Sequence, residues 1–109
     1  MKIHVSKNRL FVIKRNQMVV ISLNELLYIE RIGSRSLIQT CTRMVEVNLS
    51  LKQISETLPN NFVRSHKSFI INKERIIEIN TLNTNTVECV FEGDKSALLT
   101  KNNVDILFS

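Results

Sequence analysis

Several residue types that mark particular protein classes are scarce in this chain of 109 residues. It has no Trp, one Tyr, one Pro, two Gly and two Cys. No apolar run approaches the ~20 residues that span a bilayer, and no basic-then-apolar leader opens the chain. Hydrophobic residues still make up 43% and charged residues 23%, which are ordinary values for a globular protein. These features argue against transmembrane, secreted-peptide and disordered chains, and the length predicts one domain over residues 1–109.

The two cysteines give no sign of a metal site or a crosslink. Cys41 and Cys89 lie 48 residues apart and belong to no C-x-x-C pair. This spacing indicates neither zinc binding nor a disulfide framework. We therefore expect two reduced thiols in or near strands of a cytosolic protein, with no metal and no other cofactor.

Groups that serve catalysis or base stacking are also sparse. His4 and His66 are the only histidines, and no nucleophile stands beside a base, so we do not expect an enzyme. The two glycines form no phosphate-binding loop. Proteins that bind single strands stack bases on exposed aromatic rings. Here four of the aromatic residues fall in apolar runs typical of a core, which argues against a protein that binds single strands. These residues are Phe11, Phe62, Phe69 and Phe91.

Positive charge is what the chain has in excess. Its 15 Lys and Arg outnumber its 10 Asp and Glu, which gives a net charge of +5. Residues 1–75 carry 13 of these cations against 5 Glu, while residues 76–109 carry 2 against 5 acids. Such a balance favours a polyanionic partner. No basic amphipathic helix is visible that would lie on a membrane, so nucleic acid is the favoured partner.

Alternating apolar residues predict a mainly β fold. Ile and Val contribute 23 residues, and short apolar segments follow one another at close spacing, which is typical of stacked antiparallel sheets. The predicted strands are 9–14, 18–21, 26–31, 36–40, 44–48, 69–71, 75–79, 86–91 and 96–99. The first two form a hairpin around the polar turn 15–17.

One short helix is predicted by local chemistry. Ser50 and Gln53 have the spacing of a capping box, Leu49 and Ile54 can form a hydrophobic staple, and Pro59 ends the helix. A weaker copy of this pattern at 21–26 predicts a single helical turn. A terminal helix of about two turns is predicted at 101–108.

Two polar segments are candidate binding sites. The loop Arg31–Ser36 is basic, and Gly33 would let its backbone approach a ligand, although composition alone favours a solvated loop. In the stretch 62–72, period-two counting puts Phe62, Arg64, His66 and Ser68 on one side of a strand. His66 could bind a phosphate or could hold a turn, and spacing alone leaves both open.

This stretch reads F-V-R-S-H-K-S-F-I-I-N and resembles the signature F-x-R-x-H-x-S-[FY]-x-[VI]-N of LytTR DNA-binding domains. These domains are the output modules of a class of bacterial response regulators. The similarity covers nearly the whole chain, including Tyr28-Ile29-Glu30, Leu49–Lys52 and Leu58–Phe62. The segment 99–102 matches the usual S-R pair of the family more weakly.

The resemblance implies a mainly β fold of about ten short strands with a short helix, which binds duplex DNA through loops on one edge. Side chains from these loops would enter successive major grooves of a bent duplex. The first base-reading loop would be Gly33–Ser36, with Ser34 and either Arg35 or Ser36 at the key position. The second would be the signature, with Arg64, His66 and Ser68 near phosphates and Lys67 reaching a base. The third would be Lys101 and Asn102, where the usual Arg is replaced.

We therefore expect a sequence-specific module that binds double-stranded DNA and regulates transcription in the bacterial cytoplasm, with no membrane partner. Direct-repeat promoter sites and a second copy of the chain on DNA are further expectations from the resemblance. No receiver domain fits in this length, so the chain is either the effector part of a longer regulator or a stand-alone protein. The alternative function is a β-rich interaction domain that docks a sensor or partner without reading DNA.

Overall fold

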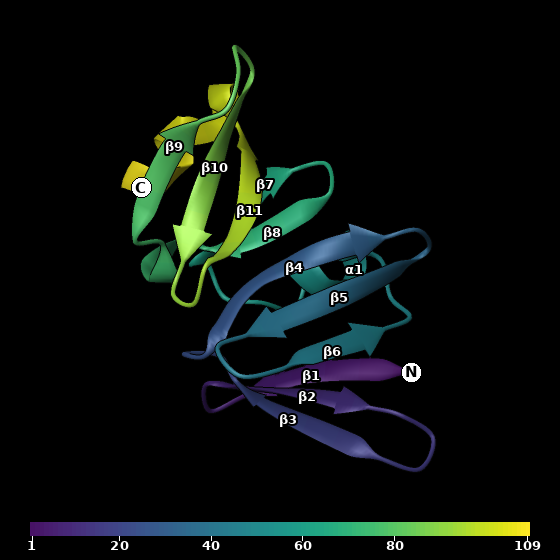
Figure 1. The fold of residues 1–109 in the computed structure, drawn as a ribbon. Helices are drawn as coiled ribbons and strands as arrows, with labels where there is room; N and C mark the ends of the chain where they lie inside the picture. Colours follow the sequence, from purple (N-terminus) through teal and green to yellow (C-terminus); the bar gives the residue numbers. More distant parts are fainter.

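The computed structural model describes residues 1–109 and confirms the predicted mainly β fold (Figure 1). Eleven short strands form three antiparallel sheets, accompanied by one α-helix and two 3₁₀ segments. The molecule is elongated, measuring 45 × 26 × 25 Å. None of its helices has the length and apolar character needed to traverse a bilayer. The strands are β1 (Lys2–Ser6), β2 (Arg9–Ile13), β3 (Met18–Ser22), β4 (Leu26–Ile32), β5 (Arg35–Thr40), β6 (Met44–Val47), β7 (Phe62–His66), β8 (Phe69–Asn72), β9 (Glu78–Thr81), β10 (Thr86–Phe91) and β11 (Lys95–Thr100).

The central sheet has five strands in the order β6-β5-β4-β8-β7. Its middle strand, β4, is buried on both faces, which explains the continuous apolar run at its start. Ile29 of β4 pairs with Ile38 of β5 on one side and with Ile70 of β8 on the other. The neighbouring Tyr28 points to the opposite face, where it contacts Phe69 and Phe91.

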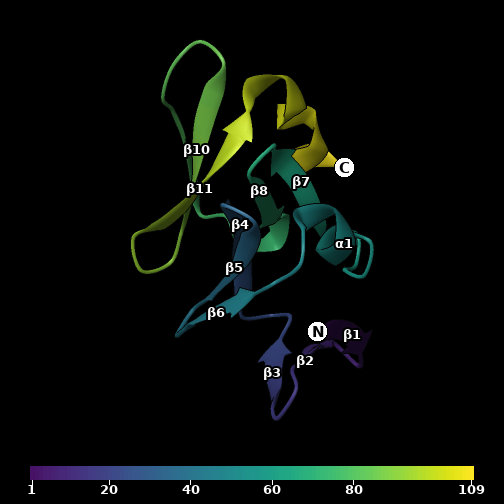
Figure 2. The same cartoon turned by 90° about the vertical axis from the view of Figure 1, so that its right-hand side faces the viewer.

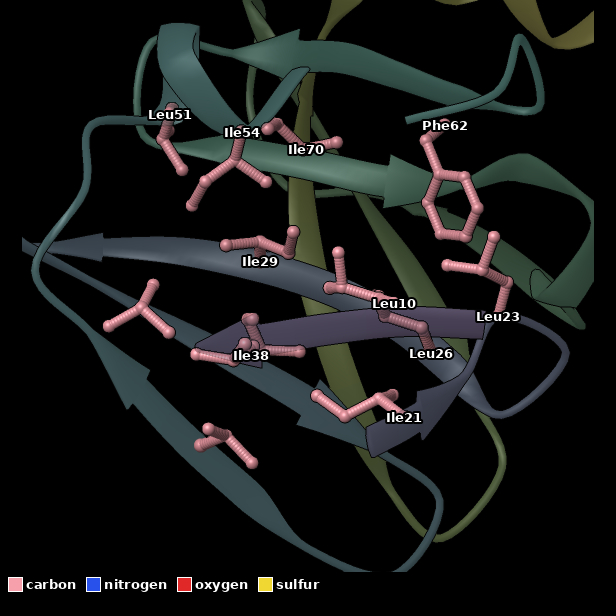
Figure 3. Close-up of a cluster of buried hydrophobic side chains, with 13 residues drawn as sticks. Leu10, Ile21, Leu23, Leu26, Ile29, Ile38, Leu51, Ile54, Phe62 and Ile70 are labelled. Atoms are coloured by element: carbon pink, nitrogen blue, oxygen red, sulfur yellow. The ribbon is translucent and has the colours of Figure 1, made fainter. Parts of the chain in front are cut away.

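The two faces of β4 belong to two separate hydrophobic cores. The first core contains Ile29 and side chains from β2, β3, β5, β6, α1, β7 and β8, which point toward one another in Figure 3. The second core contains Tyr28 and lies between β4, β8, β10 and β11. Each fully buried Ile or Leu contributes on the order of 1.5–3 kcal/mol to folding. The central sheet therefore takes part in both cores through β4 and β8.

The N-terminal sheet has the order β1-β2-β3 and contains the predicted hairpin. Leu10 and Val12 of β2 are buried in the first core, while Phe11 between them is only half-buried. The prediction that Phe11 is a core residue is therefore wrong, because alternation along β2 directs its ring away from the core. Arg9 lies over this ring, with its guanidinium carbon 5.2 Å from the ring centre.

The predicted capping box is present. Helix α1 spans Leu51–Ser55, with the Ser50 hydroxyl accepting from Gln53 N and Gln53 Oε1 accepting from Ser50 N. Leu51 and Ile54 are buried in the first core, and Leu49 packs against it, as a hydrophobic staple requires. The helix ends earlier than Pro59 would dictate.

Three predicted elements differ from the structure. The strand expected at 75–79 begins at Glu78, because Asn72 caps a 3₁₀ turn, η1 (Lys73–Arg75), by accepting from Glu74 N. The terminal helix η2 (Lys101–Phe108) is 3₁₀ in type, and it is tied back by Lys73 Nζ to the carbonyl of Ser109. The helical turn expected at 21–26 is a non-helical turn closed by Glu25 N and Ser22 O.

Candidate nucleic-acid interface

Two turns of the central sheet lie at the same edge of the molecule. The β4–β5 turn contains Gly33 and Ser34, and the β7–β8 turn contains Lys67 and Ser68. Both lie at the right-hand edge in Figure 1, and Figure 2 looks directly at this edge. The two turns are far apart along the chain but are linked by a hydrogen bond, in which the backbone N–H of Arg31 donates to the carbonyl of Ser68 over 2.8 Å. This hydrogen bond continues the β4–β8 ladder into the turns and sets their relative position.

The third predicted segment, at the end of β11, is held against the same strand pair. Ser65 of β7 is fully buried, and its hydroxyl donates to the carbonyl of Leu98 over 2.8 Å. Asn103 Nδ2 donates to the carbonyl of Ser65 over 3.5 Å. Lys101 and Asn102 lie between these two contacts and are exposed. The structure thus brings all three segments to β7 and its turn, although they are far apart in sequence.

The β4–β5 turn is a tight two-residue connection between the paired residues Ile32 and Arg35. Gly33 adopts a φ of 62°, a left-handed conformation that favours glycine. A Cβ at this position would meet no atom within 4 Å, so the requirement for glycine is conformational. The Nε of Arg31 donates to the carbonyl of Gly33 over 3.1 Å, which further orders the turn.

Arg35 and Ser36 follow this turn but have different surroundings. The side chain of Arg35 is 60% exposed, and its Nη1 lies 2.6 Å from Oε1 of Glu46 on β6. Ser36 is 1% exposed, and its hydroxyl donates to the carbonyl of Leu49 over 2.7 Å. Since sequence left the choice between these two residues open, this difference decides which side chain is accessible. Ser36 anchors the linker before α1 and is left out of the proposed interface.

The signature segment forms a turn that its own side chains stabilise. Arg64 donates from Nε to the carbonyl of His66 over 3.1 Å and from Nη2 to the carbonyl of Lys67 over 2.6 Å. Nδ1 of His66 accepts from the backbone N–H of Ser68 over 3.1 Å, and its ring contacts Phe69 edge-on. His66 therefore holds the turn, and its Nε2 is the atom available to a ligand. Lys67 is exposed at the tip of the turn.

The predicted alternation along this segment fails after Ser65. A register shift between Arg64 and His66 indicates a bulge at Ser65, which leaves that residue without a cross-strand partner on β8. Phe62 and Arg64 keep to one face, and Ser65 faces β11 on the side of Val63, as alternation requires. The bulge then pairs His66 with Phe69, which belongs to the second core. The period-two assignment of His66 to the face of Phe62 is therefore wrong, and Ser68 lies in the turn that follows β7.

A hollow with four cations around it lies between the β4–β5 turn, β7 and the start of α1. It encloses about 240 Å³, and its lining includes Arg31, Arg35, Lys52 and Arg64 but no Asp or Glu. We call this site, with its four cations, the basic hollow. Arg31 begins the basic loop predicted as a candidate site but was given no contact of its own, and Lys52 was not predicted, because it reads as part of a capped helix. Only the packing of α1 against β4 and β7 brings Lys52 beside Arg31.

Comparison with known proteins identifies the family of this chain. Residues 16–108 match the family model described as the LytTr DNA-binding domain. The chain is 31% identical over 99 residues to the transcriptional regulatory protein NatR of Bacillus subtilis (strain 168), a match that covers 89% of this chain and 42% of that protein. The chain thus spans less than half the length of this curated relative.

A solved structure has the same fold. The LytTr DNA-binding domain of a proposed methyl-accepting/DNA response regulator from Bacillus cereus superposes with a TM-score of 0.77 at 17% identity, covering 92% of this chain and 93% of that one. At this identity the likeness shows the fold alone. The signature, the family-model match and the fold are consistent with one another, and this chain belongs to the LytTR DNA-binding domain family.

Proposed function

We propose that this chain is the DNA-reading module of a bacterial transcription regulator that acts on double-stranded DNA in the cytoplasm. The observation that carries this proposal is the convergence of three polar segments at β7 and its turn. Each segment ends in an exposed side chain suited to a base or a phosphate: Arg35, Lys67 and Lys101 with Asn102. The relative NatR is named as a transcriptional regulatory protein, which supports the same function.

The side chains divide into two roles on chemical grounds. Arg reads guanine O6 and N7 with two parallel hydrogen bonds, Asn reads adenine N6 and N7, and Lys reads guanine less rigidly. The proposed base-reading residues are therefore Arg35 and Asn102, with Lys67 and Lys101. We propose that Ser34 also contacts the duplex, next to Arg35. Arg64 and Ser68, with Nε2 of His66, would bind phosphates and position the duplex.

The basic hollow adds a phosphate site between the β4–β5 turn, β7 and the start of α1. Its four cations converge without a carboxylate in the lining, and backbone phosphates are the anions that a duplex would present there. Arg64 donates to the turn from Nε and Nη2, so its two Nη1 donors remain available to a phosphate. Binding at the hollow would place the duplex across the β4–β5 and β7–β8 turns.

We further propose that the loop with Arg35 and the segment with Lys101 and Asn102 enter successive major grooves and that the duplex bends toward the protein. Each segment is too short to follow a groove around the helix, so both can contact bases only where the major groove faces the protein. That occurs every ~10–10.5 base pairs. Flexible pyrimidine–purine steps between the two contacts should favour binding, since bending costs ~1–6 kcal/mol depending on the sequence.

The test begins with selection of bound fragments from a random duplex library. Spacer variants of the selected site are then compared by gel shift at one salt concentration. Insertion of ~5 base pairs between the two groups of base pairs that the protein reads turns one groove away from it. Affinity should then fall toward the non-specific range of ~10⁻⁴–10⁻⁶ M. An affinity that ignores this insertion would overturn the two-groove arrangement. A direct repeat in the selected sequences would support binding by two copies.

Salt dependence separates DNA reading from the alternative of a protein-docking domain. For duplex binding, log K should fall with log salt by ~0.9 for each phosphate contact. No enrichment of any duplex during selection, together with a shallow slope, would overturn the proposal and favour docking to a protein.

A further inference from the structure

The N-terminal hairpin places two more cations at the edge that carries the proposed interface. The β2–β3 turn spans residues 14–17 and is closed by the backbone N–H of Lys14, which donates to the carbonyl of Gln17 over 2.8 Å. Arg15 is exposed at its tip and Lys14 is half-buried. Figure 1 shows this turn at the same right-hand edge as the β4–β5 turn.

Packing fixes this hairpin relative to the β4–β5 loop. Leu10 and Val12, which precede the turn on β2, are fully buried in the first core together with Val45 and Val47 of β6. Lys14 and Arg35 line the same shallow depression, whose floor includes Val47. The hairpin cations therefore continue the basic edge beyond Arg35, on the side away from the β7–β8 turn.

The charges of this hairpin are uncompensated within the protein. The structure contains two salt bridges, Arg35–Glu46 and Arg75–Glu92, and neither involves Lys14 or Arg15. No side-chain hydrogen bond of either residue occurs in the structure. Glu46, the acidic residue in the depression, is already paired with Arg35. Two free cations beside a base-reading loop attract the polyanionic backbone of a duplex that lies on this edge.

We propose that Lys14 and Arg15 bind backbone phosphates in the flank beyond the base pairs read at Arg35, so that the contacted duplex is longer than the three loops alone would cover. This inference rests on the proposed function, since it places the same duplex along a longer surface. Contacts of this kind carry no base information and act on every sequence alike. They would strengthen binding and set the orientation of the duplex along the long axis of the molecule.

The experiment compares the parent chain with the double variant Lys14→Gln/Arg15→Gln on the selected site and on random duplex. The charge-matched control is Lys7→Gln/Arg9→Gln, which removes two exposed cations near the β1–β2 turn, at the opposite end of the same sheet. We expect the double variant to bind both duplexes more weakly, with a salt slope lower by ~1.8 for two contacts. The deficit should therefore shrink roughly ten-fold between 50 and 200 mM salt. The control should match the parent.

A duplex-length series locates the contacts. The selected site is trimmed on one side or the other, up to the base pairs that the protein reads. On one trimmed duplex the parent should fall to the affinity of the Lys14→Gln/Arg15→Gln variant, because the phosphates that Lys14 and Arg15 bind are gone. On the other trimmed duplex the difference between the two proteins should persist.

Three results would overturn the inference while leaving the proposed function intact. These are an unchanged salt slope in the double variant, an equal loss in the Lys7→Gln/Arg9→Gln control, and an equal deficit on both trimmed duplexes. The last two would show that net charge alone is responsible. If the parent binds no duplex at all, the inference and the proposed function both fail.

Discussion

Arg35 and Glu46 form a diagonal ion pair across neighbouring strands, with Nη1 and Oε1 2.6 Å apart at the exposed face of the β5–β6 ladder. Both side chains are more than half exposed, at 60% and 54%. A pair this exposed contributes ~0–1 kcal/mol to folding. Its consequence is positional, because Glu46 holds the guanidinium at the mouth of the basic hollow before DNA arrives.

The first prediction concerns this arginine. Arg35→Ala should cost ~1–3 kcal/mol of binding free energy on the selected site and relax preference at one base position. Thermal unfolding should barely change, since the pair is exposed. Gel shifts on the selected site and on single-base variants measure the effect. If affinity for selected and random duplex falls equally, Arg35 contacts only phosphate.

The second prediction separates two neighbouring cations of the signature. Lys67→Ala should weaken DNA binding and lower the salt slope by about one while the free energy of unfolding stays within ~0.5 kcal/mol. Arg64→Ala should weaken binding and also cost ~0.5–1.5 kcal/mol of stability, because two turn carbonyls lose their donor. Urea unfolding distinguishes them. Equal stability losses would contradict the different roles assigned here.

The third prediction concerns His66. His66→Ala removes the acceptor of the Ser68 N–H and the edge contact with Phe69, so it should destabilise the domain by roughly 1–2 kcal/mol. If turn formation is its main role, the folded variant should keep most of the parent salt slope. A stable variant that binds the selected site and random duplex more weakly to the same extent would instead identify His66 chiefly as a phosphate ligand.

The fourth prediction tests the structural role of Ser36. Ser36→Ala leaves the half-buried carbonyl of Leu49 without the donor that the buried Ser36 supplies, and it should cost ~0.5–1.5 kcal/mol of stability. Below the unfolding transition, base preference should be that of the parent. A stable variant with altered preference would return Ser36 to the base-reading position.

The fifth prediction concerns the two thiols, both of which are free. Burial, together with the nearby Glu88 carboxylate, raises the pKa of Cys89 to about 11. Since the unfolded thiol ionises near its ordinary pKa of 9.0, the unfolded state loses its proton first as pH rises. Stability from this residue is therefore complete below pH ~9 and declines toward pH ~11. A Cys89→Ser variant should lack this part of the alkaline decline.

Thiol labelling in the native state provides an independent check on the same residue. Cys41 is half-buried and should react with a thiol reagent in the folded domain, while the fully buried Cys89 should react only on unfolding. Reaction of both thiols at the same rate in native buffer would contradict the burial of Cys89.

Local chemistry was enough to predict most elements of this fold. The capping box at Ser50 and Gln53 involves residues three apart, so its geometry follows from the helix itself. The hairpin at 9–21 follows from alternation around a polar turn. The family signature at 62–72 identified the family and its fold, because its residues follow one another along the chain.

Contacts between distant segments decided the rest. The register shift between Arg64 and His66 pairs His66 with Phe69, on the face opposite to the predicted one, and Ser65 within the bulge donates to β11, 33 residues away. The burial of Ser36 depends on the carbonyl of Leu49, and the basic hollow depends on the packing of α1 beside β4 and β7. Alternation and capping depend on residues a few positions apart, whereas the accessibility of a side chain depends on what the rest of the chain packs against it. The pattern could therefore place Arg35 and Ser36 side by side, but only the folded chain exposes the first and buries the second.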